Sequence, residues 1–129
     1  MSKPLNPEQC PKQSARYQSF VVRAAQWEGF WGLYHNGWLL HTSGGQTFCP
    51  VFARREDAQS WGASIQTNHV PVPITLVDAI EHIVPDWQAN GVMAGVSPTP
   101  ALAPVLIAPD EFAQDLLSAL KSALNGNKS

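Results

Sequence analysis

The dipeptide Asn36-Gly37 constrains the fold most, because it lies between two runs of apolar and aromatic residues, 30–34 and 38–42. Asn and Gly both tolerate the positive φ angles of a type I′ turn, and this pair between hydrophobic runs is the strongest local signal for a hairpin. A two-residue loop would pair His35 with Trp38. The sequence therefore predicts a β-hairpin. Neither of its faces is plainly polar, so both are expected to be covered at least in part.

Length and charge set the class of protein. A chain of 129 residues is expected to form a single domain, over residues 14–125, with a flexible tail at 1–13 and a frayed end at 126–129. The net charge of −2 comes from scattered residues, so there is no basic stripe for nucleic acid and no polybasic segment for membranes. No apolar run approaches the roughly 18 residues of a membrane span, and residues 1–13 lack the apolar core of a signal peptide. We therefore expect a cytoplasmic protein that binds neither nucleic acid nor membranes.

The spacing of apolar residues predicts four helices, over residues 14–28, 54–65, 75–90 and 109–125. The buried face of the first helix is predicted to consist of Tyr17, Phe20, Val21, Ala24 and Trp27. Extended segments are predicted over 46–53, 69–74, 92–96 and 105–107. Together with the hairpin they indicate an α+β domain, with a mostly antiparallel sheet of about five strands and helices packed against it.

Prolines mark the edges of this predicted sheet. Pro50 lies inside the strand at 46–53, and Pro71 and Pro73 lie inside the strand at 69–74. A proline has no N–H group to donate to a neighbouring strand. The first of these strands is therefore predicted to lie at an edge or to be bulged at Pro50, and the second is predicted to be an edge strand.

Three groups of residues resemble the DUF2750 family. They are Trp31-Gly32-Leu33-Tyr34 with Gly37-Trp38, then Pro50-Val51-Phe52 with Arg55-Glu56-Asp57-Ala58 and Trp61, and finally Val92-Met93-Ala94-Gly95-Val96. The resemblance runs from about Tyr17 to Leu117 and implies a small bacterial protein of unknown function. It carries an architecture and no catalytic signature, and Arg54 stands where a Ser-like helix cap is expected. A shorter stretch, from Val51 to Trp61, is similar to part of the SseB family.

The sequence contains no catalytic or metal-binding motif. The histidines lie in separate predicted elements, with no HExxH and no paired CxxC, and glycine-rich nucleotide loops are absent too. We therefore expect no catalytic residues, no cofactor and no metal. One alternative stays open, in which Cys49 is a nucleophile and His41 or His35 is its base. A cysteine in an apolar strand is more often a buried core residue.

Surplus aromatic side chains provide the candidate binding site. Five Trp, five Phe and two Tyr are many for so small a domain, and an exposed aromatic patch marks a binding surface. The candidates are Trp31, Tyr34, Trp38 and His41, in and beside the predicted hairpin. The sequence favours a non-enzymatic module that binds another protein or regulates it. The alternatives are a small thiol-dependent enzyme and a small-ligand binder with an aromatic-lined pocket between the hairpin and the helix at 76–87. No pattern indicates the partner or the oligomeric state.

Overall fold

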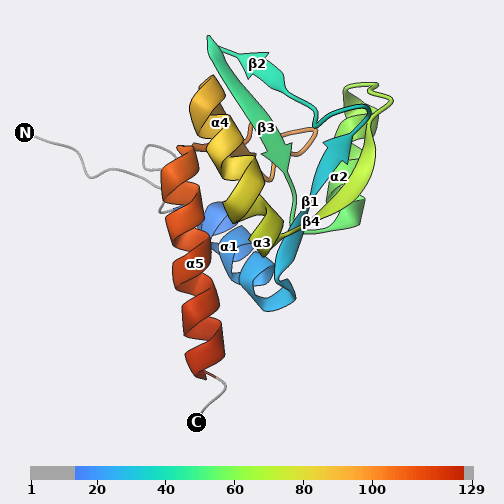
Figure 1. The fold of residues 1–129 in the computed structure, drawn as a ribbon. Coiled ribbons are helices and arrows are strands. Elements are labelled where there is room, and N and C mark those ends of the chain that lie inside the picture. Colours follow the sequence, from blue (N-terminus) through green and yellow to red (C-terminus); the bar gives the residue numbers. More distant parts are fainter. Residues whose placement is uncertain (1–13, 127–129) are drawn as a thin grey trace, which may run out of the picture.

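The computed structural model describes residues 14–126, and the expected tail at 1–13 and residues 127–129 lie outside this range (Figure 1). The described chain has the predicted α+β class. Its helices are α1 (Ala15–Trp27), α2 (Arg55–Ser64), α3 (Leu76–Asp78), the π-helix η2 (Ala79–Ile83), α4 (Val84–Asn90) and α5 (Pro109–Gly126). Its strands are β1 (Gly29–Tyr34), β2 (His41–Ser43), β3 (Gln46–Val51), β4 (Val70–Thr75), β5 (Val92–Val96) and β6 (Val105–Ile107).

Helix α1 has the start and stop that its sequence predicts. The Ser14 side chain caps it by accepting a hydrogen bond from the Tyr17 backbone N–H. At the other end Glu28 takes the left-handed conformation, with φ of 60°, and its N–H donates to the Ala24 carbonyl. The chain then enters β1 at Gly29, so the reversal occurs directly after the last helical residue, Trp27.

The strands form a two-stranded sheet of β1 and β4 and a four-stranded sheet in the order β2-β3-β5-β6. Pairing is antiparallel except between β3 and β5, which are parallel because a long helical connection separates them in sequence. Trp31 and Phe52 join the two sheets, since each backbone N–H donates to the other residue's carbonyl at 2.8 Å. The prediction of a mostly antiparallel sheet is confirmed, with six strands where about five were expected.

The predicted hairpin is wrong in its pairing. The chain does turn at Asn36 and Gly37, which have φ angles of 57° and 144°, but the bridge joins Tyr34 rather than His35 to Trp38. Beyond this bridge the two arms separate, because β1 pairs with β4 over six residue pairs and β2 pairs with β3. The local turn preference determines where the chain reverses. The backbone groups of β1, however, form hydrogen bonds with the distant strand β4 instead of with the other arm of the turn.

Strand β3 is internal, so its predicted edge position is wrong. It has β5 on one side and β2 on the other. The Phe52 backbone groups face β1, and residue 50 faces the same side because backbone directions alternate along a strand. On that side, the pairing of β2 with β3 ends at Phe48, and the bridge between Trp31 of β1 and Phe52 lies four residues further on. Pro50 lies between these two partners, where no donor is required.

Strand β4 is an edge strand, as its prolines predicted. Its strand partner within residues 14–126 is β1. Trp31 is opposite Pro73, and its backbone groups are directed to Phe52 instead. Pro73, and Pro71 two residues earlier, therefore face away from β1.

Pro85 explains the irregular helix between β4 and β5. Thr75 caps the start of α3, because its side chain accepts a hydrogen bond from the Asp78 N–H. Pro85 has no N–H, and its ring crowds the carbonyl four residues earlier. The helix widens into η2 just before it, where the Val84 N–H donates to the Ala79 carbonyl, and α4 then continues with Pro85 in its first turn.

Two hydrophobic clusters hold helices on opposite faces of the strands. The larger joins α1, α4 and α5 to one face and includes Phe20, Phe30, Val51, Trp87 and Phe112. The smaller packs α2 on the other face through Leu33, Phe52, Ala58 and Trp61. Figure 1 shows the resulting three layers, with α2 on one side of the strands and α1, α4 and α5 on the other.

Candidate functional site

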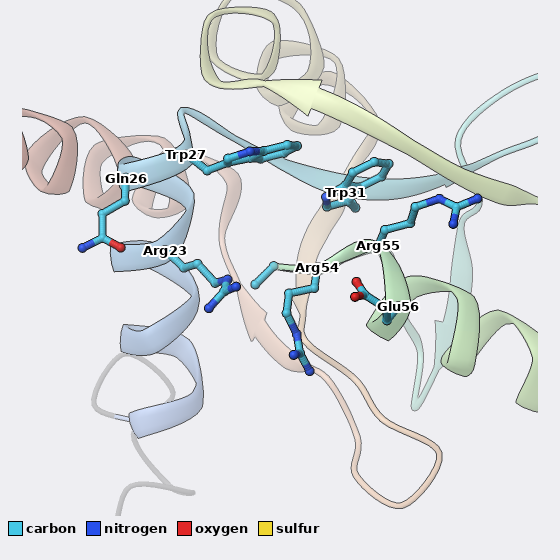
Figure 2. A pocket seen from close by; sticks show the side chains of 8 residues that line it. Arg23, Gln26, Trp27, Trp31, Arg54, Arg55 and Glu56 are labelled. Carbon is cyan, nitrogen blue, oxygen red and sulfur yellow. The ribbon is translucent and has the colours of Figure 1, made fainter.

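A groove opens between the end of α1, the start of β1 and the start of α2 (Figure 2). We call it the arginine–tryptophan groove, and its lining residues are Arg23, Gln26, Trp27, Trp31, Ala53, Arg54, Arg55 and Glu56. Its volume of about 480 Å³ lies within the range of small-molecule and cofactor pockets. The lining combines aromatic rings with cations, which suits a ligand that is partly apolar and partly anionic.

Two stacked tryptophans form one wall of the groove. The rings of Trp27 and Trp31 have centroids 5.6 Å apart and planes inclined by 17°. Trp27 is 54% exposed, so the prediction that it belongs to the buried face of the first helix is wrong. The reversal at Glu28 brings β1 back beneath the end of α1, and Trp27 lies against Trp31 rather than in the core. An open indole face binds planar and apolar groups.

Three arginines lie beside this wall and are held differently. Arg54 donates from Nε and Nη2 to the two carboxylate oxygens of Asp57, at 3.2 and 3.1 Å. Arg54 therefore occupies the cap position of α2 without a side-chain capping bond of the Ser type. Within residues 14–126, neither Arg23 nor Arg55 makes a hydrogen bond or an ion pair. Their guanidinium groups are available to a ligand.

A second hollow of about 350 Å³ continues the groove along α1 and shares Arg23, Ala53 and Arg54 with it. Arg16 lines this part, and its Nη1 donates to the carbonyls of Ser97 and Ala103, at 2.8 and 2.7 Å. These bonds tie the loop before β6 to α1. The basic character of the groove therefore continues, but the Arg16 guanidinium already has acceptors.

A separate pocket lies where the sequence placed a possible ligand site, between the segment after β1 and the helix at 76–87. It has a volume of about 530 Å³ and is lined by Trp38, Leu40, Thr47, His82, Ile83, Asp86, Trp87, Asn90 and Val92. The Trp38 ring lies over Gly32, where a Cβ would come within 3.0 Å of two ring carbons. Asp86 accepts a hydrogen bond from Asn90 at 3.2 Å. This pocket, which we call the Trp38 pocket, places one carboxylate beside an aromatic wall.

Of the four predicted binding residues, the structure brings Tyr34 and Trp38 into contact and places Trp31 in a different hollow. Trp31 lines the arginine–tryptophan groove, and Trp38 lines the Trp38 pocket. Tyr34 packs edge-on against Trp38 with 5.0 Å between ring centroids, and His41 lies against Phe48 at 5.6 Å. A binding role for each of them stays a prediction.

The arginines of the groove carry little signal in the sequence. Arg23 lies on a helix and has no neighbour in sequence that marks it. The adjacent pair Arg54 and Arg55, directly after a strand, is the signal that was present. This pair predicts the start of a helix, and that start is confirmed, with Arg54 at the cap and Arg55 as the first helical residue.

Cys49 and His41 lie on opposite faces of the sheet. His41 is opposite Phe48 in the register of β2 and β3, so these two side chains share a face, and the next residue, Cys49, points to the other. Cys49 is 1% exposed, and burial raises the pKa of its thiol to about 12. His35 lies beside His69 instead, with 5.7 Å between ring centroids. Neither histidine is placed to take the thiol proton.

The described residues provide neither a cluster of metal-binding side chains nor a membrane-spanning helix. No group of three or more His, Cys, Asp or Glu side chains in residues 14–126 is arranged to hold a metal ion. None of the helices in that range is long and apolar enough to cross a membrane. No buried side-chain nitrogen or oxygen there lacks a hydrogen-bond partner, so no orphaned polar group indicates a missing cofactor.

The sequence model of the family described as "Protein of unknown function (DUF2750)" matches residues 17–116, which confirms the resemblance seen in the sequence. No curated protein and no solved structure matches the chain. The similarity to the SseB family stays a prediction. The matched span contains the whole arginine–tryptophan groove, from Arg23 to Glu56, whereas Arg16 lies just before it.

Proposed function

We propose a non-enzymatic binding function for this chain, which belongs to the DUF2750 family of proteins of unknown function. The observation that supports it is the arginine–tryptophan groove, where an exposed Trp27 stacks on a half-buried Trp31 next to two arginines without a partner among residues 14–126. Trp and Arg are the residues enriched at the energetic centres of protein interfaces. The module acts in the bacterial cytoplasm by holding another protein, and the groove is the contact surface.

The thiol-enzyme alternative has less support. A nucleophilic cysteine needs an electropositive and partly exposed setting with a base in reach. Cys49 is buried among apolar side chains, on the opposite face of the sheet from His41. Its surroundings are those of a core residue.

Affinity capture with matched variants tests the binding function. The intact chain, Trp27→Ala and Val77→Ala are each immobilised and exposed to extract of the native cell. Val77 is the control because it is 65% exposed and lies on α3, outside the groove. We expect a partner that the intact chain and Val77→Ala retain and that Trp27→Ala loses. A partner set that is the same for all three, or an empty one, would contradict the proposal.

Small-ligand binding is a second candidate function, favoured by the Trp38 pocket. Its volume of about 530 Å³ and its mixed lining suit a compact molecule with a polar group for Asp86. A ligand bound there would raise the melting temperature of the intact chain and raise that of Trp38→Ala much less. A compound library that shifts neither protein would remove this candidate.

A further inference from the structure

Charge is segregated on this domain in a way that its net charge hides. Of the eight Lys and Arg residues, five lie within residues 14–126, namely Arg16, Arg23, Arg54, Arg55 and Lys121. The four arginines all line the arginine–tryptophan groove or its continuation along α1. Lys121 lies on α5, in a different hollow. Within residues 14–126 the arginines therefore gather at the groove, although the net charge of the chain is −2, and the groove attracts anionic groups.

The groove has fixed and free cations with separate roles. Asp57 holds Arg54, and the carbonyls of Ser97 and Ala103 hold Arg16. Arg23 reaches toward the groove from α1, and Arg55 extends from the start of α2 past Trp31, away from Arg23 (Figure 2). Both lack a partner among residues 14–126. A guanidinium group presents a planar fork of donors that matches a carboxylate with two parallel hydrogen bonds.

The other walls exclude some anions. Glu56 lines the groove and Asp57 lines its continuation, so two carboxylates lie among the arginines. They would repel a continuous phosphate backbone, which places a negative charge at every step of the chain. The exposed Trp27 ring, stacked on the half-buried Trp31, favours an apolar group close to the anionic one. A peptide that carries separate carboxylates and apolar side chains satisfies both conditions.

We propose that the arginine–tryptophan groove binds a short acidic segment of a partner protein. An Asp or Glu carboxylate of that segment pairs with Arg23 or Arg55, and an apolar side chain next to it covers the Trp27–Trp31 stack. This inference rests on the proposed binding function, and it names the chemistry that the partner must present. The two hollows, of about 480 and 350 Å³, give room for more than one side chain.

A defined probe tests the chemistry directly. The probe is a fluorescein-labelled decapeptide in which Glu and Leu alternate, with binding followed by fluorescence anisotropy. Two comparison peptides replace every Glu with Gln or every Leu with Ser. We expect the Glu–Leu peptide to bind more tightly than either one, and its affinity to fall as salt rises because exposed charges are screened. Equal binding of the Gln peptide would overturn the proposal.

Variants of the chain locate the binding site. The double variant Arg23→Gln/Arg55→Gln is expected to weaken binding of the Glu–Leu peptide at least tenfold, and Trp27→Ala is expected to weaken it several-fold. Lys121→Gln is the matched control, because it removes one positive charge far from the groove, and it should change the affinity less than twofold. Circular dichroism and the melting temperature establish that each variant is folded. An unchanged affinity in the double arginine variant would overturn the proposal.

Competitors distinguish the acidic peptide from other anions. Inorganic phosphate and a single-stranded oligodeoxynucleotide are added to the complex with the Glu–Leu peptide. We expect little displacement at concentrations where the unlabelled peptide competes fully, and stronger displacement by either competitor would contradict a carboxylate ligand. A captured partner lost by Trp27→Ala but kept by the double arginine variant would defeat this inference and leave the binding function standing. A partner that Trp27→Ala also keeps would defeat both.

Discussion

The ring of Phe48 on β3 fills the space beside Gly95 on the parallel strand β5. A Cβ placed on residue 95 would lie 2.9 Å from Cγ of that ring, closer than real side chains approach. Both residues are buried, and β3 and β5 are the central strands of their sheet. The missing side chain on one strand thus makes room for an aromatic ring from the next.

Gly95→Ala is therefore expected to lower the free energy of unfolding by about 1–3 kcal/mol, the usual cost of overpacking. Gly62→Ala is the matched control, because its Cβ would meet Thr67 at an ordinary 3.4 Å. Gly62 lies inside α2, where Ala is favoured over Gly by about 1 kcal/mol, so this change should be neutral or stabilising. Denaturant unfolding of both variants provides the measurement. A Gly95→Ala variant as stable as the unaltered chain would show that Phe48 moves aside at no cost.

Trp61 anchors α2 to the sheet. It is 7% exposed and packs with Leu33, Phe52 and Ala58 in the smaller hydrophobic cluster. Trp61→Ala is expected to cost about 3–5 kcal/mol of the free energy of unfolding, whereas Trp27→Ala, at an exposed position, should cost less than about 1 kcal/mol. Denaturant unfolding compares the two. A loss below about 1 kcal/mol for Trp61→Ala would mean that α2 does not depend on this contact.

The elements of this fold were predictable where local chemistry decides them. Ser14 and Thr75 each cap a helix as their position indicates, and Pro71 and Pro73 correctly marked an edge strand. The α+β class follows from these elements. The partner of β1 was not predictable, because its pairing with β4 depends on residues about forty positions away, whereas the Asn36-Gly37 signal is local.

The candidate site was only partly predictable for a related reason. Trp31 was selected as an aromatic in the predicted hairpin, and it does line the groove. The helical spacing of Trp27 fits the apolar face of α1 and so predicts a buried side chain. Trp27 is the last residue of α1, and the chain reverses at Glu28 directly after it. At this end of the helix the side chain is left exposed instead of packed in the core. Periodicity identifies a face of a helix, but not how far the sheet beneath it extends.

The thiol of Cys49 is expected to be unreactive in the folded chain. Burial raises its pKa to about 12, so almost no thiolate is present at neutral pH, and the side chain is also inaccessible. The measurement is modification by a disulfide reagent in a Cys10→Ser variant, so that Cys49 is the one thiol present. We expect modification only after denaturant is added. Fast stoichiometric modification of the native protein would revive the thiol-enzyme alternative.

Strand β4 is expected not to add a strand from a second molecule. Between residues 70 and 74, the two residues whose backbone groups face away from β1 are Pro71 and Pro73. Because proline has no N–H, this side of the strand has no backbone hydrogen-bond donor. Hydrogen exchange should show no protection along 69–74 that grows with protein concentration. The variant Pro71→Val/Pro73→Val restores two donors and is expected to self-associate more strongly in sedimentation experiments. Concentration-dependent protection of 69–74 in the unaltered chain would show that the prolines do not block this edge.

Tyr17 links α1 to α5 and is expected to make stability fall at alkaline pH. Its hydroxyl donates a hydrogen bond to Asp115 Oδ2 at 2.6 Å. Burial is the main cause that raises the pKa of the phenol well above its ordinary 10.0, and the hydrogen bond to Asp115 is the second cause. The unfolded chain therefore loses this proton first, so the contribution to stability is complete below pH 10 and declines as the pH rises above it. Tyr17→Phe should flatten that decline, whereas Tyr34→Phe, at an exposed position, should leave it unchanged. Denaturant unfolding of the three proteins at about pH 8 and about pH 11 measures the difference, and an identical alkaline loss in all three would assign the decline to other groups.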